Sequence, residues 1–233
     1  VAQIIKNNSI VDIGWGFGFV LTSWVLFFIS GEFTVTKIIV NVLVSLWGLR
    51  LFYSILKRNI FEKEDFRYAA WRKAWGKWVV PRAFLQVFML QGILQFLIGS
   101  TSYYINANNL DFKWISLLGV LLWIIGYFYE VVGDYQLKMH IKNKTGGLLE
   151  TGLWKQTRHP NYFGEAVMWW GILLFAVLNG VPVYYIISPL VIHSVLRFIS
   201  IPLLEKKMAT YDGWSDYANA TPIMFPIIGK KDV

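Results

Sequence analysis

The chain has 233 residues, of which 56% are hydrophobic and only 15% are charged. Soluble domains carry about 25% charged residues, so this composition excludes an ordinary soluble protein. It predicts an integral membrane protein, with residues 1–233 forming one membrane domain. Cysteine is absent and the three histidines stand apart in the sequence, so neither a disulfide nor a metal site is expected.

The formal net charge of +8 does not indicate a nucleic-acid partner. The basic residues gather between apolar segments, as they do in the cytosolic loops of membrane proteins. The sequence opens with no cleavable signal peptide. Because it begins with valine rather than methionine, we expect an N-terminal piece, such as a further span, to precede it. Membrane lipids are the expected partners, and no protein partner is implied.

Six apolar segments have about the 20 residues needed to cross a bilayer. They cover residues 10–29, 35–56, 83–99, 114–132, 161–178 and 181–203. This pattern predicts an all-α fold, a polytopic bundle of about six transmembrane helices. Residues 179–182, Asn-Gly-Val-Pro, form a turn signal between the last two segments and predict a helical hairpin there.

The basic residues of the loops predict the orientation. Residues 57–82 hold eight Lys or Arg residues and residues 134–164 hold five, whereas residues 100–113 hold one. The first two loops are therefore expected in the cytosol and the third outside. With six spans, both ends of the chain then face the cytosol.

The loop 57–82 carries a helical pattern of its own. Tyr68, Trp71, Trp75 and Trp78 recur at helical spacing on one face, with lysines and arginines mostly off it. Such a segment is typical of an interfacial amphipathic helix that lies on the lipid headgroups. Pro81 is expected to end this helix.

Three further patterns are interpreted as packing features. Gly14 and Gly18 have the spacing of close helix packing and lie inside an apolar span, which argues against a dinucleotide loop. His193, deep in the sixth segment, is expected to be a hydrogen-bonded core residue. The tail repeats aromatic residues at helical spacing, at Tyr211, Trp214 and Tyr217. It is expected to be either a lid or a packed terminal segment.

Polar groups gather where the fifth segment begins. Residues 152–165 read GLWKQTRHPNYFGE, and ionisable groups at a membrane boundary are functional candidates. Pro160 suits the first position of a helix. A helix start beside a guanidinium is suited to an anion such as a phosphate, and Arg158 and His159 precede this one. One face of the helix then carries Asn161, Glu165 and Trp169 at four-residue steps.

Two other segments bring charges to the same side of the membrane. The fourth ends with Glu130, Asp134 and Lys138 on one face, where carboxylates could accept ribose hydroxyls and lysines could meet phosphates. The sixth carries Arg197 and then Glu205. A membrane arginine needs a partner, and the candidates are Glu130, Glu165 and Glu205.

The N-terminal half holds a second set of polar groups. Asp12 lies in the first segment, Arg50 and Tyr53 lie in the second, and residues 64–68 read EDFRY. These are too many polar groups for a lipid-facing surface, so they are expected to face a shared interior or the cytosolic rim. Asp12 and Arg50 in particular need partners.

These motifs resemble one family. The run 147–171, GLLETGLWKQTRHPNYFGEAVMWWG, resembles the C-terminal core of the steroid 5-alpha-reductase and sterol-reductase superfamily, particularly its uncharacterised bacterial members. The rest of the chain is similar as well. The further matching positions are Ser9 to Gly16, Glu64 to Tyr68, Arg197, Pro202 to Glu205, Tyr217 and Thr221-Pro222.

The resemblance implies a multi-pass enzyme of the bacterial inner membrane that binds NADPH in a cytosol-facing pocket. Residues 114–233 would form the cofactor-binding half, and residues 1–113 the substrate side. Carried over by position, the cofactor residues would be Asp134, Arg158, Asn161, Glu165, Trp169, Arg197 and Glu205, with Glu130, Lys138, His159 and Tyr162 as additions.

The implied reaction moves a hydride from the nicotinamide to the β carbon of an activated C=C bond in a lipid or steroid-like substrate. An acidic or phenolic pair polarises the substrate carbonyl, as the developing enolate charge requires. The glutamate and tyrosine that do this in the steroid enzymes have no matching positions here. The candidates to replace them are Tyr53, Arg50, Glu64 and Tyr68.

Two alternatives stay open. The Arg-His-Pro-x-Tyr element is shared with the isoprenylcysteine carboxyl methyltransferases, which would imply S-adenosylmethionine in the same pocket. That cofactor has no phosphate, so the basic residues around the pocket favour NADPH. A non-catalytic lipid-binding membrane protein is the second alternative.

Overall fold

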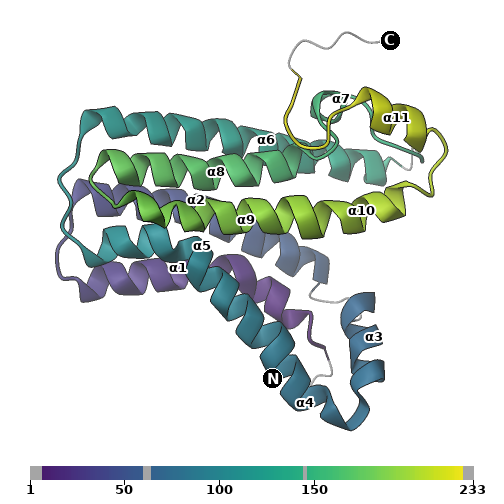
Figure 1. The fold of residues 1–233 in the computed structure, drawn as a ribbon, viewed down its shortest axis with the longest axis horizontal. Helices are drawn as coiled ribbons and strands as arrows, with labels where there is room; N and C mark the ends of the chain where they lie inside the picture. The colour runs from purple at the N-terminus through teal and green to yellow at the C-terminus, as the bar shows by residue number, and fades with distance from the viewer. Residues whose placement is uncertain (1–6, 60–63, 144–145, 228–233) are drawn as a thin grey trace. The chain divides into compact units, whose positions relative to one another are not determined.

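The computed structural model describes residues 7–59, 64–143 and 146–227. Every regular element in these ranges is helical (Figure 1). The chain divides into two compact units, one of Val1–Phe112 with Asn179–Val181 and one of Lys113–Leu178 with Pro182–Val233. The functions expected of residues 1–113 and 114–233 stay predictions.

The prediction of six spans is confirmed. Six helical stretches in the described residues have the length and hydropathy to cross a membrane: Ile10–Ile29, Val35–Lys57, Tyr68–Ala107, Trp114–Lys142, Pro160–Leu178 and Val183–Met208. The third and fourth extend beyond the predicted segments 83–99 and 114–132. Hydropathy marks only the apolar part of a helix, whereas the backbone hydrogen bonds continue into the amphipathic turns beyond it.

The first unit is a helical bundle that ends in a bent segment. Its elements are α1 (Ile10–Ile29), α2 (Val35–Asn59), α3 (Phe66–Trp75), η1 (Gly76–Trp78), α4 (Val79–Ala83), the π-helical η2 (Phe84–Met89) and α5 (Leu90–Ala107). Helices α1 and α2 approach closely at Gly16 and Gly48, because a Cβ on Gly16 would lie 2.5 Å from the Gly48 carbonyl oxygen. Of the two glycines predicted to pack closely, Gly18 does so, because a Cβ there would meet the Gln95 side chain of α5, and the prediction for Gly14 is wrong. A Cβ there would meet nothing within 4 Å, because Gly14 lies on another side of the helix.

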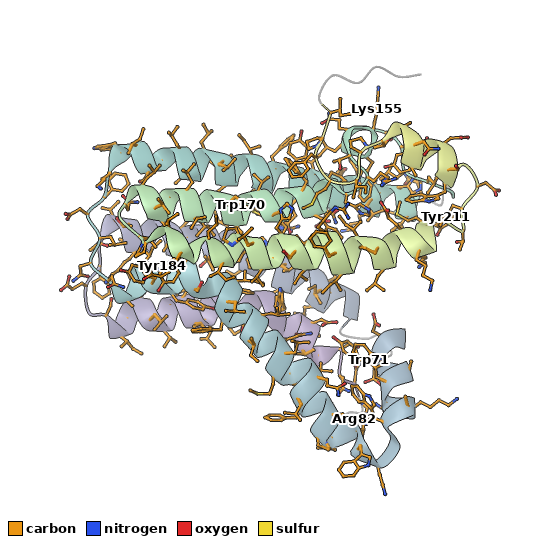
Figure 2. The ribbon with its side chains drawn as sticks, in the orientation of Figure 1. Trp71, Arg82, Lys155, Trp170, Tyr184 and Tyr211 are labelled. Atoms are coloured by element: carbon orange, nitrogen blue, oxygen red, sulfur yellow. The ribbon has the colours of Figure 1, made fainter. Side chains whose placement is uncertain are left out.

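The amphipathic segment 66–83 bends before the predicted point. Figure 1 shows α3 turned sharply from the helix that runs through α4 into α5. The turn is at Gly76, whose φ is +49°, a left-handed value that favours glycine. Pro81, expected to end the helix, instead lies in the first turn of α4, where its missing N–H is not needed. Figure 2 shows Trp71 and Arg82 on the two arms of this bend, and contact with headgroups stays a prediction.

A buried polar network joins α1, α2 and α5. Lys37, almost fully buried, donates to Ser30 Oγ at 3.0 Å and to Asn109 Oδ1 at 2.9 Å. Asn41, one turn further on, donates to Asn106 Oδ1 at 2.6 Å. Neither the bilayer nor the protein interior offers water. The polar side chains of the three helices therefore satisfy their hydrogen-bonding capacity with one another.

The second unit has more elements, and its core is the pairing of α6 with α8. The elements are η3 (Trp114–Ser116), α6 (Leu117–Lys142), α7 (Leu153–Gln156), α8 (Pro160–Leu178), η4 (Val183–Ile186), α9 (Ile187–Val195), the π-helical η5 (Leu196–Ser200), α10 (Ile201–Met208) and α11 (Trp214–Ala220). The turn 179–182 joins α8 to η4, with Gly180 at a φ of +106°.

Glycines at seven-residue spacing bring α6 and α8 into backbone contact. They are Gly119, Gly126 and Gly133 on α6, and Gly164 and Gly171 on α8. A Cβ on Gly126 would lie 2.6 Å from the Gly164 carbonyl oxygen, and one on Gly171 would lie 2.7 Å from the Trp123 backbone nitrogen. Small residues permit this close approach. In a membrane the hydrophobic effect does not drive helices together, so the van der Waals packing of such close contacts drives their association.

We predict that Gly164→Ala lowers the free energy of unfolding by about 1–3 kcal/mol, because its Cβ would meet the Glu130 backbone nitrogen and force the helices apart. Gly92→Ala in α5 is the matched control. Its Cβ meets nothing within 4 Å, so alanine should be neutral or add up to about 1 kcal/mol. Apparent melting temperatures in detergent check both, and equal effects of the two substitutions would contradict the packing account.

Candidate functional site

The short helix α7 is held against the C-terminal half of α6. Gln136 on α6 accepts the Leu153 backbone N–H at 3.0 Å, and the Trp154 indole donates to the Gly133 carbonyl at 3.1 Å. Tyr217 on α11 donates its phenol to the Trp154 carbonyl at 2.7 Å. Burial raises the pKa of Tyr217, so the phenol keeps the proton that it donates. These bonds fix the chain just before α8.

The tail after α11 is bonded to the residues that lead into α8. The Arg158 backbone N–H donates to the Pro222 carbonyl at 2.9 Å, and the Ile227 N–H donates to the Gln156 carbonyl at 3.0 Å. Thr157 adds a bond from its hydroxyl to the Ile223 carbonyl at 3.3 Å. Of the two predicted roles, lid or packed terminal segment, this tail has the contacts of a packed segment. Figure 2 shows Lys155 and Tyr211 pointing outward at this end of the unit.

Arg158 is buried, with 6% of its surface exposed, and its charge is compensated. Its Nε lies 2.9 Å from Glu205 Oε1, an ion pair without the alignment of a hydrogen bond. Nη1 donates to the Ala218 carbonyl at 2.9 Å, and the guanidinium lies 5.4 Å from the centre of the Trp214 ring. The guanidinium is therefore positioned from α10 and from α11.

His159 shares the same carboxylate. Only 1% of its surface is exposed, its Nε2 lies 3.1 Å from Glu205 Oε1, and its ring stacks on Tyr162 at 5.7 Å. Burial lowers the pKa of His159, although the hydrogen bond to Glu205 opposes this shift, and the nearby Arg158 and Arg197 reinforce it. The imidazole is thus held neutral between two cations and one anion.

Asn161 links α8 to α6 and keeps one buried polar atom unsatisfied. Its Nδ2 donates to Asp134 Oδ1 at 3.1 Å. Its Oδ1 is shielded from solvent and accepts no hydrogen bond in the ranges that the structure describes. An enclosed carbonyl oxygen without a donor is costly, so this atom is suited to a ligand N–H or O–H.

The other predicted cofactor residues are spread along the same helices. Glu130 and Trp169 are buried, Glu165 and Arg197 are half-buried, and Lys138 is exposed. Glu205, a candidate partner of Arg197, pairs instead with Arg158, because α10 meets the start of α8. Arg197 lies on the π-helical η5, with its guanidinium 5.6 Å from the Phe198 ring.

The four predicted catalytic residues lie in the first unit. Glu64 pairs with Arg72 at 2.8 Å, and this hydrogen bond holds the pKa of Glu64 below its usual value. Tyr68 donates to Asp12 at 2.8 Å, which supplies the partner expected for Asp12. Tyr53 is 62% exposed on α2, and Arg50 is half-buried on the same helix.

Sequence reasoning missed several members of the candidate site. The Ala218 carbonyl and the Trp214 ring, which position Arg158, come from a segment about 60 residues away. Backbone acceptors leave no sequence signal. The aromatic repeat around Trp214 was visible, but its partner was not. Sequence reasoning also missed Gln136, which accepts the Leu153 N–H, and Gln156, which accepts the Tyr129 hydroxyl, because only the fold brings these partners together.

We predict that acidification destabilises the protein through His159. Since its folded-state pKa is lowered, the unfolded chain binds more protons below about pH 6.5, and stability present above that pH is lost as the pH falls toward the folded pKa. The loss is at most about 1.4 kcal/mol per pH unit. His159→Gln should flatten the fall in apparent melting temperature between about pH 7.5 and pH 5.5. His140→Gln, at the end of α6, is the control, and equal slopes for wild type and His159→Gln would contradict the assignment.

One protein family matches nearly the whole chain. The family model described as "Protein of unknown function (DUF1295)" matches residues 1–221. An uncharacterised protein of Schizosaccharomyces pombe is 24% identical to the chain, and the match covers 58% of the chain and 47% of that protein, so the chain spans about half the length of this relative. No solved structure matches. The chain is a multi-pass helical membrane protein of the DUF1295 family.

Proposed function

We propose that this protein is a membrane-embedded, NADPH-dependent reductase of a C=C bond in a lipid or steroid-like substrate, related to the steroid 5-alpha-reductases. One observation carries the proposal. Three of the residues that carry this resemblance form a polar cluster at the start of α8, in which Glu205 contacts both Arg158 and His159. The proposal extends to a cytosol-facing site in a bacterial inner membrane, which the basic loops support.

The cluster has donors for a phosphate. A guanidinium carries five N–H donors, and the described contacts of Arg158 involve only Nε and Nη1. Helix α8 begins two residues later at Pro160, and the positive end of its dipole attracts anions. Glu205 partly neutralises Arg158, so an incoming phosphate would share the guanidinium with that carboxylate rather than meet an unpaired charge.

The cluster also has acceptors for the uncharged parts of a dinucleotide. Asn161 Oδ1 is buried and accepts no hydrogen bond from the described part of the chain, and a ribose hydroxyl or a carboxamide N–H would supply one. Asp134 orients this amide, and Glu130 is a buried carboxylate one turn earlier on α6. The residues present therefore fit the cofactor chemically.

The chain's own contribution would be binding, orientation and exclusion of water. NADPH, when bound, supplies the hydride. Glycine-mediated contact between α6 and α8 closes the interior below the cluster, and the fully buried Trp169 fills the same helix face as Asn161 and Glu165. Around these helices, exposed apolar side chains such as Leu121, Phe128 and Leu190 are suited to contact lipid, the medium from which an apolar substrate would come.

We predict that NADPH raises the apparent melting temperature of the detergent-purified protein and that Asn161→Leu abolishes the rise. A ligand at 100 times its dissociation constant stabilises by about 2.7 kcal/mol. Leucine keeps the size of the side chain but removes the enclosed acceptor. The exposed Asn219 on α11 gives the matched control, because Asn219→Leu should retain the full response.

Three outcomes of this titration have different meanings. Stabilisation by S-adenosylmethionine alone would replace the reductase with a methyltransferase. A folded protein that responds to neither cofactor would favour the non-catalytic lipid-binding role. A response to NADPH that persists in Asn161→Leu would keep the cofactor but remove it from this cluster.

A further inference from the structure

A second enclosed polar atom lies deeper in the membrane, on His193. The residue lies on α9, within the span Val183–Met208, and is half-buried. Its Nδ1 is shielded from solvent and has no hydrogen-bond partner among the described residues. The expectation of a hydrogen-bonded core histidine is therefore not met at this nitrogen.

An unsatisfied imidazole nitrogen is unfavourable at this depth. Neither lipid tails nor a dry interior can hydrogen-bond to it, so the residue loses its hydration without compensation. Intramembrane ionisable residues usually serve a ligand or a pathway. No group of three His, Cys, Asp or Glu residues in the described ranges could hold a metal ion, so a metal does not account for this nitrogen.

Aromatic side chains border the imidazole. The Phe225 ring, from the tail, lies 6.1 Å from the His193 ring at an angle of 33°. The same Phe225 ring contacts Phe163 on α8 at 6.2 Å, edge to face. Phe225 is nevertheless 65% exposed, so much of its surface is available to a further apolar group. Arg197, one turn further along the same span, also acts electrostatically on the imidazole. A few polar groups beside exposed aromatic surface suit a mostly apolar ligand.

We propose that His193 hydrogen-bonds an oxygen of the lipid ligand, a carbonyl or a hydroxyl, while Phe225 and Phe163 contact its apolar body. The proposal rests on the proposed function in that it names the group on the reductase's substrate that the protein recognises. His193 is then a residue that sets specificity, because a site built to hydrogen-bond an oxygen rejects analogues that lack it.

The free protein offers a readout that a structural histidine would not give. If Nδ1 is unsatisfied without ligand, His193→Phe removes a buried polar atom, keeps a ring of similar shape, and should raise the apparent melting temperature. If the histidine instead supports the fold, the same substitution should lower it. His140→Phe, outside the apolar part of α6, is the matched control and should leave the ligand affinities unchanged.

The ligand test uses two probes, cholest-4-en-3-one and the hydrocarbon cholest-4-ene. Binding to wild type, His193→Phe and His140→Phe is followed by the intrinsic fluorescence of the chain's 12 tryptophans. We expect the wild type to prefer the ketone, and His193→Phe to weaken ketone binding about tenfold, or ~1.4 kcal/mol. Binding of the hydrocarbon should stay the same in all three proteins.

Several results would overturn the proposal. They are a lower melting temperature for His193→Phe, equal weakening of both probes, or a wild type that binds neither probe or shows no preference for the ketone. Stabilisation by NADPH should persist in His193→Phe, and its loss there alone would move His193 into the cofactor site. If NADPH fails to stabilise the wild type, the reductase proposal fails, while the two readouts on His193 still decide the lipid-recognition site.

Discussion

The close backbone contact between α6 and α8 determines where the polar groups of the second unit lie. Five glycines at seven-residue spacing remove the side chains that would separate the helices. Because the helices meet this closely, the Asp134 side chain accepts a hydrogen bond from Asn161. The Gly133 carbonyl accepts one from the Trp154 indole. A wider separation would break these bonds and leave buried polar atoms in a medium that cannot satisfy them.

Compensation of charge determines how the side chains just before α8 are arranged. Arg158 and His159 precede α8 at its membrane boundary, where an unpaired guanidinium and an imidazole without a hydrogen-bond partner would be costly. One carboxylate, Glu205, contacts both side chains, and the Ala218 carbonyl accepts a hydrogen bond from the guanidinium Nη1. The tail bonded beside residues 156–158 adds three backbone acceptors or donors. The cluster is therefore pre-formed, and a ligand would meet oriented groups rather than create them.

Periodicity predicted which of the candidate residues share one helix, and it failed where distant helices meet. Asn161, Glu165 and Trp169 follow from four-residue spacing, and the polar run before Pro160 was evident in the sequence. The pairing of Glu205 with Arg158 depends on where α10 returns toward α8, which no local pattern encodes. Gly16 rather than Gly14 meets α2 because helix rotation, not motif spacing, selects the contacting face. Buried Lys37 and the unsatisfied His193 were likewise unpredictable, since both depend on neighbours from other segments.

Amide hydrogen exchange with and without NADPH tests the account most directly, because it locates the ligand without any substitution. The account predicts that NADPH slows exchange in residues 153–165 and in the tail 214–227, and that S-adenosylmethionine does not. These are the segments whose backbone bonds surround Arg158 and the start of α8. Protection confined to residues 1–112, or equal protection by both cofactors, would contradict a pyridine nucleotide at this cluster.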